Sequence, residues 1–159
     1  MKAITLHQPW ATYMAVGLKM IETRSWPTTH RGWLAIHAGK NEESLYLTDM
    51  YARAACLEAP DSPTVRALRP LPDPLPLGAI VAVGCLKEVR TTEALELEVL
   101  GTDRPLGNYE PGRYGWVFSE IIQCEPIPCR GYQQLWGVPE PIAEQLRHLI
   151  ADRQQERAQ

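Results

Sequence analysis

One short stretch concentrates the residues that could bind an anion or catalyse a reaction. Residues 17–26, GLKMIETRSW, place a glycine, a lysine, a glutamate and an arginine within eight positions. If residues 20–24 form a strand, Glu22 and Arg24 point to the same face, about 7 Å apart along it. Lys19 would follow a helix that ends at Gly17, and its ammonium group is expected to be exposed. Such a cluster could hold an anion with Lys19 and Arg24 while Glu22 accepts a hydrogen bond or a proton.

The same spacing also fits a structural role. Networks of Glu, Arg and Lys are common on protein surfaces and contribute little to stability. The spacing alone therefore leaves two alternatives open, a ligand site and an ion network that binds nothing.

The distribution of charge favours the same region as a ligand site. The whole chain has a formal net charge of −3, which argues against a non-specific nucleic-acid binder. Residues 1–40, however, carry a net charge of +4, and the remainder carries −7. An anionic ligand is therefore expected to meet the first forty residues.

Several residues outside the charged segment could complete such a site. Trp26 lies beside the segment and before a proline, so it is the first candidate to stack on a base, and Tyr114 in a glycine-flanked loop is the second. Lys40 follows a glycine in a predicted turn and could contact a phosphate. His37 lies in a predicted strand and is expected to be a hydrogen-bonding residue of the core.

Neither a metal nor an organic cofactor is predicted. The four cysteines form no CxxC pair and the histidines show no ligand spacing, so the cysteines are expected to be reduced, small apolar residues. No phosphate-binding loop and no dinucleotide-binding GxGxxG motif follows a predicted strand.

The elements that must position these residues are short and mixed, which predicts an α+β fold with a small mixed sheet or barrel. The predicted strands are residues 2–6, 32–38, 78–89 and 115–123, with extended segments at 19–25, 127–129 and 134–136. The predicted helices are residues 9–17, 41–57, 92–100 and an amphipathic helix from Pro141, with a frayed tail at 154–159. A proline-rich connection spans residues 60–76. No apolar run reaches 18 residues and no signal-peptide core is visible, so a cytoplasmic protein is expected.

The charged segment resembles the signature of a known family. Its pattern GxKxxExR resembles that of the ASCH domain family. Further blocks resemble the family in the same order, from residue 4 to about 138: QPWA (8–11), RSWP (24–27), RGWLAIHA (31–38), GAIVAV (78–83), YGWVF (114–118) and QQLW (133–136). By this resemblance, residues 1–140 form one ASCH domain, and residues 141–159 form a helix packed on it.

The resemblance implies a fold and a function. It implies a small β-barrel like that of PUA domains, with flanking helices and a cleft beside the motif. The expected ligand is RNA, a nucleotide or a nucleoside, with no membrane partner. The expected ligand-binding residues are Lys19, Glu22, Arg24, Ser25, Trp26, Lys40 and Tyr114.

Two alternatives to simple binding remain open. A few small relatives hydrolyse an acyl group from an acylated cytidine, with a lysine at the position of Lys19 and a threonine where this chain has Glu22, and others have been described as ribonucleases. If this chain is an enzyme, Lys19 and Glu22 would be its catalytic residues, but a carboxylate held ionised by two cations is a poor base. Binding without efficient deacylation is therefore expected. The other alternative is a co-regulator module that binds a protein through the proline-rich segment 60–76.

Overall fold

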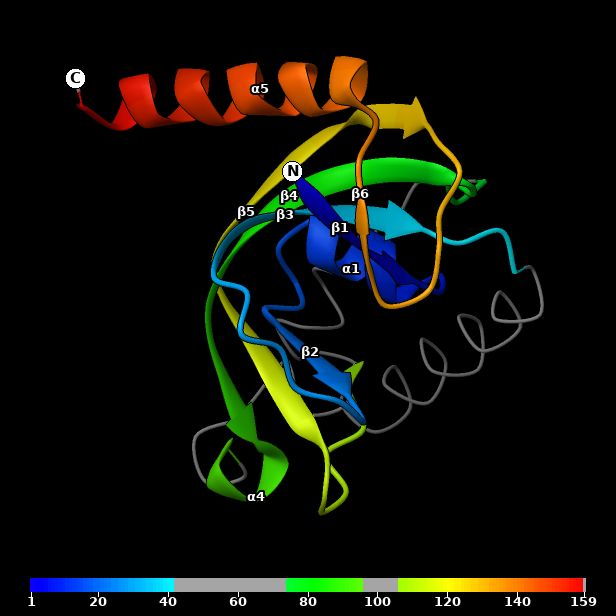
Figure 1. Ribbon diagram of the computed structural model, residues 1–159, viewed down its shortest axis with the longest axis vertical. Helices are drawn as coiled ribbons and strands as arrows, with labels where there is room; N and C mark the ends of the chain where they lie inside the picture. The colour runs from blue at the N-terminus through cyan, green and yellow to red at the C-terminus, as the bar shows by residue number, and fades with distance from the viewer. Residues whose placement is uncertain (42–73, 96–105, 159) are drawn as a thin grey trace, which may run out of the picture.

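Six strands form one curled sheet in the computed structural model, which describes residues 1–41, 74–95 and 106–158 (Figure 1). The strands are β1 (Lys2–Leu6), β2 (Ile21–Arg24), β3 (Gly32–Ala38), β4 (Ala79–Thr91), β5 (Tyr114–Pro128) and β6 (Leu135–Gly137). Their order in the sheet is β2-β5-β4-β3-β1-β6. The described helices are α1 (Trp10–Ala15), α4 (Thr92–Leu95) and α5 (Glu140–Ala158). The expected α+β fold, a small barrel-like sheet with flanking helices, is confirmed in the form of a half-barrel.

The sheet curls because its long central strands are bulged. β1 is parallel to β3, and the other pairings among the described strands are antiparallel. The register shifts once between β3 and β4 and three times between β4 and β5. Each bulge bends its strand and increases the local twist, so the shifts add up to a strong curvature. This curvature brings β2 toward β1, although the two strands are not neighbours in the sheet.

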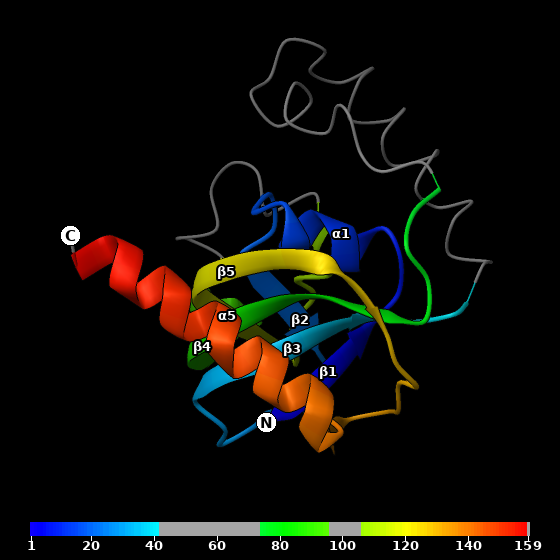
Figure 2. The same cartoon turned by 90° about the horizontal axis from the view of Figure 1, so that it is seen from above.

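Both faces of the sheet are covered, each by a helix on its own apolar cluster (Figure 2). Alternate residues of a strand point to opposite faces. On β3, Leu34 and Ile36 therefore pack in the cluster that holds Ala11 and Met14 of α1. Ala35 between them packs in the cluster that holds Leu146 of α5. None of the helices in the described ranges is long and apolar enough to cross a membrane.

The sequence predicted the short elements more closely than the long ones. The strands at 2–6 and 32–38 are confirmed to the residue, and the first helix ends before Gly17, whose φ is +77°. The strands predicted at 78–89 and 115–123 extend to Thr91 and Pro128, and β5 takes in most of the short strand expected at 127–129. The predicted helix at 41–57, the helix at 92–100 after Leu95, and most of the proline-rich segment 60–76 lie outside the described residues.

α5 is helical up to Ala158, through most of the segment 154–159 that was expected to fray. Ionic contacts join this part of α5 to the sheet. Nη1 of Arg157 donates to Oε2 of Glu120 on β5 at 2.8 Å, and Arg153 lies 3.9 Å from the other carboxylate oxygen of Glu120. These contacts hold the last turns of the helix to the sheet.

Candidate functional site

The charged segment folds into a chain of three paired ionic groups, Lys19, Glu22 and Arg24, called here the ion chain. The ammonium group of Lys19 donates to the carbonyl oxygen of Ile21 and lies 3.3 Å from Oε2 of Glu22. Oε1 of the same carboxylate lies 3.2 Å from Nε of Arg24. Glu22 thus contacts one cation with each of its oxygens.

The expectation that the Lys19 ammonium group is exposed is wrong, because Lys19 is completely buried. The turn after α1 explains the difference. The backbone N–H groups of Leu18 and Lys19 both donate to the carbonyl oxygen of Tyr13, which folds the chain back on the helix end. The lysine side chain is thereby directed beneath β2 instead of into solvent.

Arg24 differs from its two partners because it reaches the surface. Its side chain is 25% exposed, against 11% for Glu22 and 0% for Lys19. Its Nη2 donates to the carbonyl oxygen of Thr5 on β1 at 2.7 Å. The guanidinium group is therefore fixed between β2 and β1, with Glu22 behind it.

A cavity of about 1100 Å³ lies in front of Arg24. Its walls come from the ends of β1 and β3, from Arg24 and Trp26 at the end of β2, and from residues 128–134. The last of these segments ends β5 and connects it to β6. The volume is slightly above the usual range for small-molecule sites, about 300–1000 Å³.

The cavity is positively charged. Arg24, Lys40 and Arg130 line it, each from a different segment of the chain. Among the described residues of its lining, none is Asp or Glu. The arrangement suits an anion that accepts hydrogen bonds from several directions, such as a phosphate.

The structure brings together only part of the predicted ligand set. Arg24, Trp26 and Lys40 share the cavity wall. Lys19 and Glu22 lie behind Arg24 and do not line the cavity.

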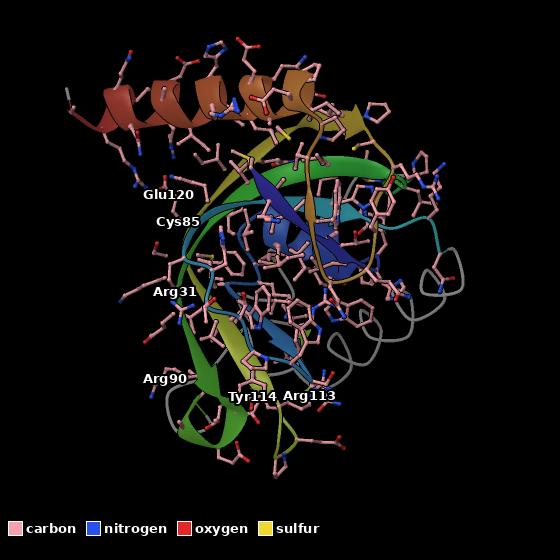
Figure 3. All side chains as sticks on the ribbon, viewed as in Figure 1. Arg31, Cys85, Arg90, Arg113, Tyr114 and Glu120 are labelled. Atoms are coloured by element: carbon pink, nitrogen blue, oxygen red, sulfur yellow. The ribbon has the colours of Figure 1, made fainter. Side chains whose placement is uncertain are left out.

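The remaining two predicted residues also lie outside the lining. Ser25 is exposed. Tyr114, the first residue of β5 (Figure 3), pairs with Arg24 of β2, but its half-buried side chain packs against the core and does not line the cavity.

Arg130 and Tyr132 of the cavity wall were not predicted. Both lie in the connection between β5 and β6, about a hundred residues after the charged motif. Contacts between distant segments bring this connection to the site: the antiparallel pairing of β6 with β1, and the hydrogen bond of Cys129 to His37. The one signal in the sequence was an arginine and a tyrosine around a glycine between two predicted strands.

His37 forms the floor of the cavity beneath this connection. It is 2% exposed, its Nε2 bonds to the carbonyl oxygen of Cys129 at 2.9 Å, and its Nδ1 has no hydrogen-bond partner in the described chain. Burial of the ring is the main effect and lowers the pKa of His37. The hydrogen bond to Cys129 raises this pKa and the nearby charge of Lys40 lowers it, so that the pKa is lowered overall. His37 is therefore a neutral, hydrogen-bonding residue at neutral pH, and its expected core role is confirmed.

The described residues contain no group of three or more His, Cys, Asp or Glu side chains placed to hold a metal ion. The free cysteines there are Cys85, Cys124 and Cys129. Burial raises the pKa of Cys124 to about 11, so its thiol is protonated and unreactive at neutral pH.

Comparison with known proteins identifies the family. The family model of the ASCH domain matches residues 4–128, most of the chain. The chain therefore belongs to the ASCH domain family, as the GxKxxExR pattern predicted.

Two curated relatives share part of this sequence. Activating signal cointegrator 1 of Mus musculus is 33% identical over 91 residues, and that of Homo sapiens is 32% identical over 92 residues. Each match covers 57% of this chain and 15% of the relative, so the similarity concerns a small part of those longer proteins.

Solved structures of the same family agree in fold. ASCH from Zymomonas mobilis has a TM-score of 0.53 at 12% identity, covering 93% of this chain and 94% of the other. A tyrosine-to-phenylalanine mutant of that protein has a TM-score of 0.54 at 13% identity, covering 93% and 96%. At this identity, the likeness concerns the fold alone.

The burial of Lys19 leads to a stability prediction. Lys19→Ala should lower the free energy of unfolding by about 3–5 kcal/mol, because it removes the hydrogen bond from Lys19 to the Ile21 carbonyl oxygen and a buried partner of the Glu22 carboxylate. Urea unfolding measures the loss. Lys87→Ala, at an exposed lysine of β4, is the control and should change the free energy by less than about 0.5 kcal/mol. A Lys19→Ala protein as stable as this control would contradict a structural role for Lys19.

The lowered pKa of His37 leads to a prediction about pH. Between the ordinary histidine pKa of about 6.5 and its lower value in the folded protein, the unfolded chain binds more protons at this residue. His37 should therefore contribute stability that is present above about pH 6.5 and is lost as the pH falls through the folded-state pKa. Urea unfolding from pH 7.5 to 5 should show a steeper loss for the wild type than for His37→Gln, which keeps a donor for Cys129. Parallel losses would show that His37 does not titrate differently on folding.

Proposed function

We propose that this ASCH domain binds RNA or a nucleotide in the cavity in front of Arg24, chiefly through phosphate. The observation that carries the proposal is the convergence of Arg24, Lys40 and Arg130 on one cavity whose described lining includes no acidic residue. A cavity wall that presents cations and no acidic residue attracts anions, and a guanidinium group can bind phosphate by paired hydrogen bonds.

Arg24 is the principal phosphate ligand in this proposal. Glu22 and the carbonyl oxygen of Thr5 hold its guanidinium group from two sides, at 3.2 and 2.7 Å. A side chain that is already ordered loses little conformational entropy when it binds, so more of the interaction appears as affinity. Lys19 and Glu22 then affect the ligand through Arg24, and they are positioning residues.

Trp26 supplies an aromatic surface beside these cations. Its ring contacts that of Trp116 edge to face, with centroids 4.8 Å apart, and its carbonyl oxygen accepts from the Trp116 indole N–H at 3.3 Å. Trp116 is fully buried, so Trp26 is anchored to the core while it lines the cavity. A ring fixed in this way can stack on a base without the cost of being ordered first.

The salt dependence of binding tests the proposal. With labelled single-stranded RNA of eight nucleotides, three cations should give a log–log slope of about −2, since each phosphate contact of a single strand contributes about −0.7. Lys40→Gln should weaken binding and reduce the slope by about 0.7. Lys87→Gln is the matched control, because this exposed lysine on β4 does not line the cavity. A slope steeper than about −4, or equal effects of the two variants, would reject binding in this cavity.

The ion chain also yields a prediction about hydrolysis. Both oxygens of the Glu22 carboxylate are engaged by cations, at 3.3 and 3.2 Å, and Glu22 does not line the cavity, so it is not placed to take a proton from a water beside a bound substrate. The purified protein should therefore not turn over N4-acetylcytidine, measured by chromatography of the nucleoside. Robust turnover that disappears in Glu22→Gln, with the urea midpoint unchanged, would make Glu22 a catalytic base and reverse this interpretation.

A further inference from the structure

Tyr132 is the most exposed of the large apolar side chains in the described residues, and it lies in the cavity wall. Its exposed fraction is 51%, and Val16, at 38%, is the other such residue. An exposed aromatic ring gains little from the hydrophobic effect in the free protein. Beside a cluster of cations, such a ring is a typical stacking surface of single-stranded nucleic-acid sites.

The exposed ring is connected to the core by two further rings. Tyr132 packs against Trp136 with centroids 5.6 Å apart, and Trp136 packs against His37 at the same separation. Trp136 is 6% exposed, and its indole N–H donates to Oγ1 of Thr5 at 3.1 Å. The three rings, called here the aromatic ladder, run from the buried floor of the cavity to its surface.

The neighbours of Tyr132 fix its place as well. Arg130 lies over the ring, 5.2 Å from its centroid, in a cation–π contact. Gly131 between them packs so closely on His37 that a Cβ there would collide with the imidazole ring. The connection therefore holds Tyr132 in one position, with half of the side chain still open to a ligand.

We infer that Tyr132 stacks on an unpaired base, so that the cavity selects single-stranded RNA or free nucleotides over sugar phosphates and other anions of equal charge. The inference rests on the proposed function, because the phosphate contacts would hold the base at the ring. It adds a selectivity that the cations cannot provide, since a phosphate carries no information about a base. Tyrosine suits the role because its ring offers a large contact area with only two side-chain torsions to order.

Two octanucleotides of equal charge test the inference. One is octaadenylate RNA, and the other has the same backbone with an abasic sugar at every position. The wild type should bind octaadenylate about tenfold more tightly than the abasic octamer, since stacking on one aromatic ring contributes roughly a factor of ten. Tyr132→Leu should lose most of this preference, measured as the ratio of the two affinities. Tyr132→Phe should keep the preference.

The possible failures are distinguishable. If neither octamer binds, or if Lys40→Gln leaves the affinity for both unchanged, the proposed function fails and the inference fails with it. If both octamers bind equally well to the wild type, phosphate binding stands and the inference is wrong. If Tyr132→Leu keeps the full preference, the base is held elsewhere, and the inference is again wrong. Urea unfolding of Tyr132→Leu and Tyr132→Phe separates a loss of fold from a loss of stacking, because only the leucine variant should lose base preference at equal stability.

Discussion

The Glu22 carboxylate, held between Lys19 and Arg24, is the interaction on which the rest of the site depends. A fully buried ammonium group is costly unless it is paired and hydrogen-bonded, and Glu22 and the Ile21 carbonyl oxygen meet that need for Lys19. The second oxygen of the carboxylate holds Arg24, which in turn bonds to Thr5 on β1. Since β2 and β1 are far apart in the order of the sheet, this chain of contacts connects the two sides of the half-barrel.

The same interaction divides the motif into two functions. The single negative charge of Glu22 offsets one of the two positive charges, and Lys19 is the cation that is buried. The formal positive charge that remains is on Arg24, the member of the ion chain that reaches the cavity. The family motif thus does not supply two free cations, as the spacing had suggested. It supplies one, held rigidly, and the cavity obtains its other cations from Lys40 and Arg130 on separate segments.

The sequence predicted what depends on local pattern and failed where distant contacts decide. Strands with continuous apolar or alternating character, such as 32–38, were found to the residue, and Trp26 was correctly placed beside the charged motif. The burial of Lys19 was missed because hydrogen bonds to Tyr13 set the direction of the turn, and spacing does not encode that direction. Tyr114 lies in β5 beside Arg24 instead of in a loop, and its ring packs against the core and not into the cavity, which the flanking glycines did not indicate. Arg130 and Tyr132 could not be found because the pairing of β6 with β1 brings them there.

Thr5 connects the ion chain to the aromatic ladder through two hydrogen bonds. Its carbonyl oxygen accepts from Arg24 of the ion chain, and its hydroxyl oxygen accepts from Trp136 of the aromatic ladder. Thr5 lies inside β1, which is paired on one side with β3 and on the other with β6, so its own position is fixed by the sheet. The separation of Arg24 from Trp136 is therefore set by one strand and two hydrogen bonds. The ligand proposed above, with a phosphate at Arg24 and a base at Tyr132, would meet a spacing that exists before it binds. Two contacts at a preset spacing add in affinity, because binding at one does not require the other to be rearranged.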